Sequence, residues 1–221
     1  MELNEALVVL SEGEADKKFL TAMMKSRPGY PAFDAPFPNE LHHGNTSFGK
    51  MLSAIQGDPR GFSRVRGVLI VADSGTTPAV TFGAIQRQIA GAGGYPVPAA
   101  AEAVTNRTGT HPAVAVMLVP DPATGGGLES LCVAEILSRE PWAAACVDAY
   151  LQCGQMDAHT WGAEKRDKAR YHCLVAGLNH EDPSKAVSAA FWGASPLISV
   201  QNNAFDAFAG RLKTLCNQLL A

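Results

Sequence analysis

The sequence lacks the signatures of disulfide-rich, membrane-spanning and P-loop proteins. Its five cysteines are odd in number and none forms a C-x-x-C pair, so neither a disulfide framework nor a structural zinc site is expected. The longest apolar runs, around Val68–Ala72 and Ala113–Val119, are far shorter than a membrane span. No G-x-x-x-x-G-K-S/T pattern is present, which argues against a nucleotide-binding loop of that kind.

The sequence is also poor in charge, and no basic segment precedes an apolar one near Met1. No secretory signal is therefore predicted, and we expect a soluble, cytoplasmic protein that does not contact membranes. Charged residues make up 18% and the formal net charge is −3, which argues against a nucleic-acid binder driven by overall charge. Local basic patches remain compatible with this composition.

The 221 residues, 47% of them hydrophobic, can bury the core of one domain. We predict a single α/β domain over residues 1–221, with a strand–helix core at about 1–135 and a helical extension at about 136–221. Three continuous aliphatic runs predict parallel strands that are covered on both faces. These runs are Ala6–Leu10, Gly67–Ala72 and Ala113–Val119.

Helical spacing fills most of the remaining sequence, and strands followed by helices predict a mainly parallel sheet flanked by helices. A further short strand is predicted at Glu40–Gly44. The predicted helices are Ala15–Lys25, Ser47–Ile55, Ala79–Ala90, Leu128–Ser138, Trp142–Gln152, Lys165–Leu178, Ser184–Phe191 and Asn202–Leu220.

Acidic residues follow each of the three long strands. Glu12, Asp73 and Asp121 come just after these runs, and Glu129 follows Asp121 by eight residues. In an open α/β sheet the ligand site lies beyond the carboxyl ends of the strands, so we expect these carboxylates to gather there. Their mutual repulsion needs a cation, and oxygen ligands suit Mg²⁺ or Mn²⁺. Asp16 is interpreted as a first-turn helix acid.

The residues around two of these acids resemble motifs of the Toprim (topoisomerase–primase) family. Val9–Leu20, V-L-S-E-G-E-A-D-K-K-F-L, resembles the first motif, in which a strand delivers a Glu followed by Gly and often by an Asp three residues after that Gly. Leu69–Gly75, L-I-V-A-D-S-G, occupies the place of the second motif, a strand that ends in D-x-D. Small stand-alone Toprim-like bacterial proteins also resemble the later segments Val119–Asp121, Gly127–Glu129 and Lys165–Leu178.

The resemblance implies a Toprim-like fold and a phosphoryl-transfer site in which Glu12 and Asp73 are catalytic. It further implies that Glu12 and Asp73 hold Mg²⁺ or Mn²⁺. The second acid of D-x-D is Gly75 here, so Asp121 or Glu129 is the expected replacement ligand. No tyrosine is placed to form a covalent link to DNA, so a nuclease-like phosphodiester hydrolase is expected rather than an enzyme of strand passage.

Two basic clusters offer contacts for the phosphates of DNA or RNA near such a site. The first includes Arg60, Arg64 and Arg66, before the second long strand, and the second lies on the predicted helix Lys165–Leu178. A solvated face is the alternative interpretation of both clusters. The basic residues of that helix are Lys165, Arg166, Lys168 and Arg170.

Two other functions stay open. A domain without half of its D-x-D can serve as a binding or regulatory module, with a protein partner, in a nucleic-acid or phage-defence complex. Asp73 to Thr77, D-S-G-T-T, is also similar to the turn of phosphatases with an Asp nucleophile, although Gly75 again replaces their second Asp.

Overall fold

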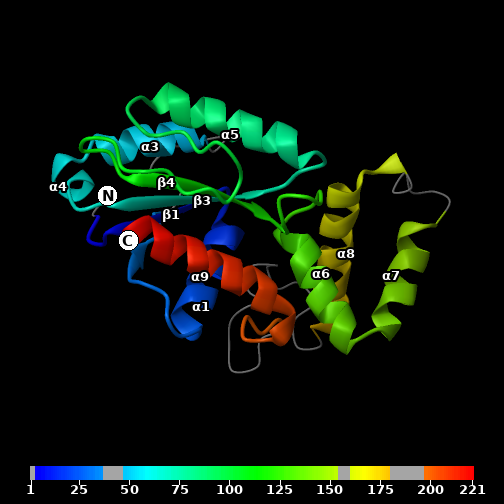
Figure 1. Cartoon of the computed structure of the whole chain (residues 1–221). Coiled ribbons are helices and arrows are strands. Elements are labelled where there is room, and N and C mark those ends of the chain that lie inside the picture. The colour runs from blue at the N-terminus through cyan, green and yellow to red at the C-terminus, as the bar shows by residue number, and fades with distance from the viewer. Residues whose placement is uncertain (1–2, 37–46, 154–159, 180–196) are drawn as a thin grey trace.

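The structure, a computed structural model, describes residues 3–36, 47–153, 160–179 and 197–221. Within these residues, four strands form one sheet with the order β2-β1-β3-β4, and every neighbouring pair is parallel (Figure 1). Leu7 pairs with Gly67 and Gly67 with Ala113, so the three long strands start in register. The strands are β1 (Leu7–Ser11), β2 (Phe33–Asp34), β3 (Gly67–Asp73) and β4 (Ala113–Val119).

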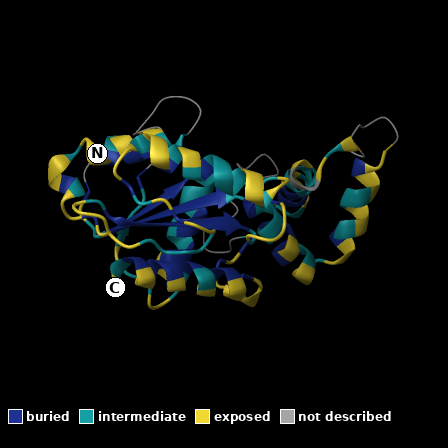
Figure 2. Ribbon diagram, turned by 45° about the horizontal axis from the view of Figure 1, so that its top comes forward, coloured by how far each residue is buried: buried dark blue, intermediate teal, exposed yellow. Residues whose placement is uncertain are grey.

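Helices cover both faces of this sheet, which explains why its long strands are apolar throughout (Figures 1 and 2). α1 (Glu14–Ser26) and α9 (Asp206–Leu220) lie on one face, and α3 (Phe48–Gln56) and α5 (Pro78–Ala92) lie on the other. Alternate strand residues enter the two cores, because successive side chains of a strand point to opposite faces. Both faces of the sheet are therefore closed to a ligand, and the ends of the strands remain.

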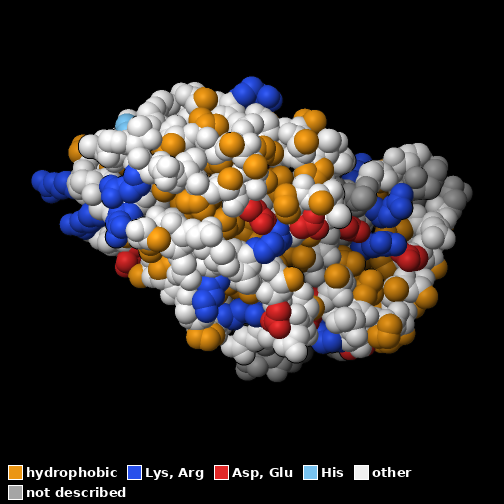
Figure 3. Space-filling model, viewed as in Figure 1, with side chains coloured by type: hydrophobic (Ala, Val, Ile, Leu, Met, Phe, Trp, Pro, Cys, Tyr) orange, Lys and Arg blue, Asp and Glu red, His pale blue; other side chains and the backbone are white. Residues whose placement is uncertain are grey.

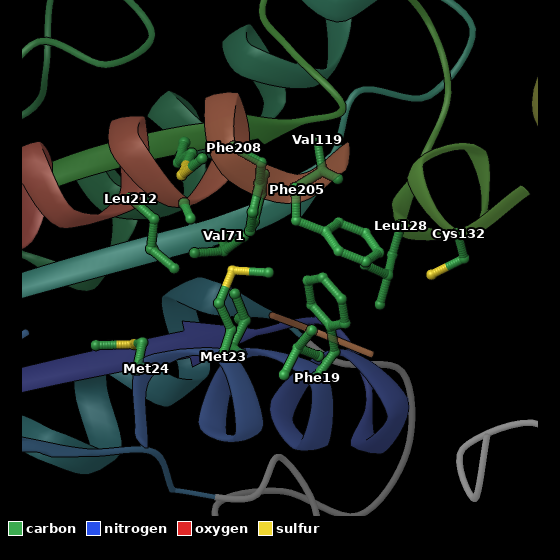
Figure 4. Close-up of a cluster of buried hydrophobic side chains, with 14 of the residues drawn as sticks. Phe19, Met23, Met24, Val71, Val119, Leu128, Cys132, Phe205, Phe208 and Leu212 are labelled. Carbon is green, nitrogen blue, oxygen red and sulfur yellow. The ribbon is translucent and has the colours of Figure 1, made fainter. Parts of the chain in front are cut away.

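Aromatic and aliphatic side chains join α1 to α9 beneath the sheet (Figure 4). The Phe19 ring lies 5.4 Å from that of Phe205 and 5.8 Å from that of Phe208, measured between centroids, in edge-on and tilted geometry. Such pairs contribute about 0.5–1.5 kcal/mol beyond the burial of their area. Leu128 and Cys132, which belong to the helix that follows β4, extend the same core.

Three helices stand beyond the carboxyl end of the sheet (Figure 1). They are α6 (Leu128–Arg139), α7 (Trp142–Leu151) and α8 (Ala163–Leu178). α6 starts shortly after β4, and its buried residues Cys132 and Ile136 share a core with Tyr171 and Leu174 of α8. This group supplies one wall at the edge where the strands end.

A buried carboxylate ties α6 to the chain before α9. Glu135 is fully buried, and its Oε1 accepts hydrogen bonds from Arg139 Nε at 2.8 Å and Asn202 Nδ2 at 3.0 Å. The carbonyl of Asn202 in turn accepts a bond from Arg27 Nη2 at 2.7 Å. Burying a charge is costly unless such partners satisfy it, so this network fixes α6 against the end of α1.

The main elements agree with the sequence analysis. The three long strands, their parallel pairing and most helices are confirmed, with ends that shift by one or two residues. The predicted helix Asn202–Leu220 is instead a 3-10 turn, η3 (Asn203–Phe205), followed by α9. β2 and the short helix α4 (Pro59–Phe62) were not predicted. The predicted strand Glu40–Gly44 and helix Ser184–Phe191 lie outside the described residues.

No helix in the described ranges combines the length and the apolar character that crossing a membrane requires.

Gly67 marks a close approach between β3 and α9, and its replacement tests this packing. A Cβ atom at Gly67 would lie 2.7 Å from the Cβ of Leu219 and 3.0 Å from its carbonyl oxygen. Gly67→Ala should lower the free energy of unfolding by about 1–3 kcal/mol, the usual cost of overpacking. Gly210→Ala is the control, because nothing lies within 4 Å of its added Cβ and alanine favours the helix by up to about 1 kcal/mol. Urea denaturation of both variants measures the difference, and equal stabilities would contradict the close packing.

Candidate functional site

Asp73 is the last residue of β3 and points its carboxylate at the start of α6. Its Oδ1 accepts a hydrogen bond from the backbone N–H of Leu128 at 3.0 Å. Its Oδ2 lies 3.7 Å from Nζ of Lys168 on α8, and the Asp73 side chain is 18% exposed. The free N–H groups of a helix start favour a negative charge, so α6 stabilises Asp73 as a carboxylate.

The glycine run before α6 makes this approach possible. A Cβ at Gly127 would lie 2.6 Å from the carboxyl carbon of Asp73, a distance that real Cβ contacts do not reach. A Cβ at Gly125 would lie 2.8 Å from the carbonyl oxygen of Gly75. The run Gly125–Gly127 therefore serves close packing around Asp73.

Gly75, where a second aspartate was expected, joins two loops. It has a φ of 61°, a conformation that glycine adopts without a steric penalty. Its backbone exchanges two hydrogen bonds with Gly126, at 3.0 and 2.8 Å. The buried Ser74 adds a third link, because its hydroxyl donates to the carbonyl of Asp121 at 2.8 Å. The loops after β3 and β4 are thereby held together.

Asp16 also belongs to this site, which the sequence analysis did not predict. It stands in the first turn of α1, where its Oδ2 accepts a hydrogen bond from the N–H of Gly13 at 2.9 Å. Burial, and then the charge of Asp73, raise the pKa of Asp16 from 3.8 to about 7. Glu129 raises this pKa further, whereas the Gly13 N–H and Lys168 lower it. Asp73, Glu129 and Lys168 therefore lie within electrostatic reach of Asp16.

A small pocket of about 10 Å³ lies between two of these carboxylates. Asp16 and Asp73 are its acidic residues, and every other residue that lines it is apolar. This apolar lining explains the desolvation of Asp16, because a charge loses hydration beside such side chains. Figure 4 shows several of these side chains converging from α1, β3, β4, α6 and α9. The apolar residues are Phe19, Leu20, Val71, Ala72, Val119, Leu128 and Phe208.

The other predicted acids reach the same edge with different surroundings. Glu12 follows the last residue of β1 and is exposed, and Glu129 is half-buried in the first turn of α6. Asp121 accepts bonds from the N–H groups of Ala123 and Thr124 and from the Thr124 hydroxyl. These bonds hold its pKa below the usual value, the Thr124 hydroxyl contributing most. Both carboxylate oxygens of Asp121 thus stabilise its own turn.

We name Glu12, Asp16, Asp73 and Glu129 the acidic group. Its ligand atoms are all carboxylate oxygens, which suit a hard divalent cation better than zinc. Within the described residues, no three His, Cys, Asp or Glu side chains are already arranged as a metal site. Burial, and then the charges of Asp73 and Glu129, nevertheless raise the pKa of Asp16. A bound cation would relieve this repulsion, so the residues fit Mg²⁺ or Mn²⁺ chemically.

Of the predicted basic residues, Lys168 alone has a described contact with the acidic group. Lys165 lies over the Trp161 ring, with Nζ 4.5 Å from the centroid. Arg170 pairs with Asp148, its Nη2 lying 2.6 Å from Oδ1. These residues stand on α8, beside the same edge of the sheet.

The sequence analysis expected three arginines to lie near the acidic residues, but the structure places them elsewhere. They are Arg60, Arg64 and Arg66. Arg66 directly precedes β3, whereas Asp73 ends it. Seven strand residues span about 20 Å, so the arginines stand at the opposite edge of the sheet. The order of the sequence contained this information, since residues before and after a strand lie at its two ends.

One signal in the sequence could have identified Asp16. It follows Gly13 by three residues, the spacing at which the first Toprim motif often carries an Asp. Its burial depends on Leu128 and Phe208, which come from helices far along the chain. The spacing alone could not show whether Asp16 is shielded from water or is a solvated acid at the start of a helix.

A comparison with protein families matches residues 6–217 to the family described as "Protein of unknown function (DUF3226)". The chain belongs to the DUF3226 family. The match begins just before β1 and ends within α9, so it includes every residue of the acidic group. No curated protein and no solved structure matches this DUF3226 chain.

The raised pKa of Asp16 predicts a pH-dependent stability. Between about pH 4 and pH 7 the unfolded chain has lost the Asp16 proton while the folded chain keeps it, so this residue's contribution to stability falls as pH rises and stays constant above about pH 7. Asp16→Asn should therefore raise the free energy of unfolding at pH 8 by roughly 2–4 kcal/mol, and this gain should shrink as the pH falls from 7 to 4 and vanish below pH 4.

Urea denaturation across this pH range, in the presence of EDTA, measures the effect. Glu14→Gln, which alters an exposed acid two residues away, is the control and should show no such slope. A gain that does not vary with pH would contradict the shifted pKa.

Proposed function

We propose that the acidic group at the carboxyl edge binds Mg²⁺ or Mn²⁺ and hydrolyses phosphodiester bonds of nucleic acid. The observation that carries this proposal is that Asp16 and Asp73 line one pocket with otherwise apolar walls, where burial and then the charges of Asp73 and Glu129 raise the pKa of Asp16. Strongly shifted carboxylates in a pocket are more frequent at functional sites than elsewhere. The resemblance of Val9–Leu20 to the first Toprim motif points to the same chemistry.

Asp16, Asp73 and Glu129 would hold the cation, together with Glu12 from the loop after β1. We assign the missing second acid of D-x-D to Asp16 and Glu129 rather than to Asp121, because the Asp121 carboxylate already accepts bonds from its own turn. A bound Mg²⁺ would polarise the phosphodiester and stabilise the charge that develops in hydrolysis.

The protein's own residues supply positioning and proton transfer. The pKa of Asp16, about 7 without a cation, would fall once the cation binds, so Asp16 would then serve as an ionised ligand. Glu12 is exposed at the same edge and can accept a proton from water that approaches from solvent. Lys168 places a positive charge beside Asp73, where it would meet a phosphate oxygen. The apolar residues that line the pocket limit the access of water to Asp16 and Asp73.

The substrate in this proposal is DNA or RNA, contacted on α8 by Lys165, Lys168 and Arg170. Lys168 lies 3.7 Å from Asp73, so a phosphate at the metal would lie within its reach, and Lys165 and Arg170 stand on the same helix. A cytoplasmic location is part of the proposal, and the free thiols of the described cysteines are compatible with it.

A second candidate is a binding module without catalysis. The observation that favours it is the pair formed by Lys168 and Asp73, since a resident ammonium already neutralises part of the acidic charge. Such a module would recognise nucleic acid or a protein partner and need no metal. Metal binding and hydrolysis separate the two candidates.

Metal binding provides the first test. Titration calorimetry with Mn²⁺ at pH 7.5 should detect binding that Asp73→Asn and Glu129→Gln each weaken by about ten-fold or more, because each removes a charged ligand. Asp121→Asn is the matched control and should bind Mn²⁺ as the unaltered protein does. NMR titration with Mg²⁺, which is diamagnetic, should also show a lower pKa for Asp16. Absence of binding would reject the metal-dependent enzyme.

Hydrolysis provides the second test. Labelled single-stranded and double-stranded DNA and RNA are incubated with Mn²⁺ or Mg²⁺, and cleavage should fall to background in Asp73→Asn while Asp121→Asn keeps activity. A small phosphomonoester should remain intact, because Gly75 replaces the second acid of the phosphatase turn. Metal binding without cleavage of any nucleic acid would favour the binding module instead.

A further inference from the structure

Four arginines form an exposed basic surface at the amino edge of the sheet, opposite the acidic group. Arg60 belongs to α4, Arg64 and Arg66 follow it, and Arg107 lies in the loop before β4. All four side chains are exposed. Figure 3 shows basic side chains gathered at the end of the molecule where α4 lies. We name these four residues the arginine surface.

An aromatic cluster brings the two segments of this surface together. The ring of Phe62, between Arg60 and Arg64 in the chain, lies 5.5 Å from the His111 ring. Tyr95 completes the cluster, with its ring centroid 6.1 Å from Phe62 and 5.4 Å from His111. His111 closes the turn that follows Arg107, because Thr108 and His111 exchange backbone hydrogen bonds. The arginines therefore extend from a packed base.

Backbone contacts fix the same segments to the sheet. The N–H of Arg66 donates to the carbonyl of Ala6 at 2.7 Å, and its carbonyl accepts from the N–H of Ala113 at 2.9 Å. Asp58 begins α4 by accepting the N–H of Gly61 at 3.2 Å. The N–H of Arg64 donates to the carbonyl of Gly61 at 3.0 Å. Arg64 and Arg66 thus project from positions that the fold determines.

Acidic residues do not neutralise this surface within the described part of the chain, where no ion pair involves the four arginines. The nearest acids along the sequence are engaged elsewhere: Asp58 caps α4, Asp73 ends β3 at the opposite edge, and Glu102 pairs with Arg211. A chain with a net charge of −3 thus concentrates exposed arginines at one end.

We propose that the arginine surface is a docking site for the phosphate backbone of nucleic acid, separate from the acidic group. A guanidinium presents a planar fork of N–H donors that matches phosphate oxygens, so four arginines favour a chain of phosphates over a single anion. A protein partner is disfavoured, because its interfaces centre on exposed aromatic or aliphatic anchors. Here Tyr95 is buried and Phe62 is half-buried in the base.

The proposal rests only in part on the proposed function, since docking at this edge needs neither metal nor hydrolysis. The two edges are about 20 Å apart, which corresponds to about six base pairs of duplex at 3.4 Å each. A duplex of 20 base pairs is therefore long enough to contact both edges, and a docked duplex is not expected to depend on Asp73.

Fluorescence anisotropy of a labelled 20-base-pair DNA duplex, in 0.1 M salt with EDTA, tests the docking. Arg64→Glu should weaken binding by about ten-fold, and Arg64→Glu with Arg66→Glu by more. The slope of log K against log salt should become less steep by about 0.9 for each phosphate that the variant no longer neutralises. Arg87→Glu is the control, because it makes the same charge change at an exposed position on α5 and should alter binding less than two-fold. Circular dichroism confirms that the variants fold.

Equal losses of affinity in Arg64→Glu and Arg87→Glu would overturn the proposal, because they would indicate a general effect of net charge. Unchanged affinity in the double variant, or no binding by the unaltered protein, would overturn it as well. Asp73→Asn in the same assay distinguishes this proposal from the proposed function. If Asp73→Asn binds the duplex as tightly as the unaltered protein does, docking at the arginine surface is supported. This result holds whether or not the unaltered protein hydrolyses nucleic acid.

Discussion

The hydrogen bond between the Asp73 carboxylate and the first N–H of α6 is the contact around which the carboxyl edge is arranged. It requires glycine at position 127, since any Cβ would occupy the space of the carboxyl group. It also requires the loops after β3 and β4 to adjoin, which Gly75 and Gly126 achieve by backbone pairing. The acid, the helix dipole and the glycines therefore form one constraint. The charge of Asp73, which this constraint holds in place, adds to burial in raising the pKa of Asp16 and lies beside Lys168.

The charges of the protein are divided between the two ends of its sheet. Carboxylates meet at the end where the strands finish, and exposed arginines stand where they begin. This arrangement follows from parallel strands, because every residue after a strand lies at one edge and every residue before a strand lies at the other. Phosphates approaching the molecule would be drawn to the basic end first and repelled by the acidic end unless a cation is bound there.

Much of the fold could be predicted because β1, β3 and β4 are continuous aliphatic runs, which only a sheet covered on both faces accommodates. β2 could not, because its two residues carry no pattern and its place depends on pairing with β1. That Glu12, Asp73, Asp121 and Glu129 follow the carboxyl ends of the strands could be read from the order of strands and helices alone.

The surroundings of the acids were harder to infer, because they depend on side chains from distant helices. Asp16 is half-buried in a pocket that Leu128 and Phe208 also line, and no local spacing relates these residues to it. The turn of Asp121, by contrast, had a local signal, since an Asp whose side chain accepts the N–H groups two and three residues later is a common loop motif.

The network around Glu135 has a consequence for how the molecule comes apart. Asn202 donates to the buried carboxylate of Glu135 and accepts from Arg27, so residues from three distant parts of the sequence share one set of hydrogen bonds. If the segment before α9 detached, the buried carboxyl group of Glu135 would lose one of its hydrogen-bond donors, which is costly inside the protein. α9 is therefore not expected to fray from the sheet as an isolated helix. Its release, the opening of α6 and the exposure of the pocket between them should be a single cooperative event.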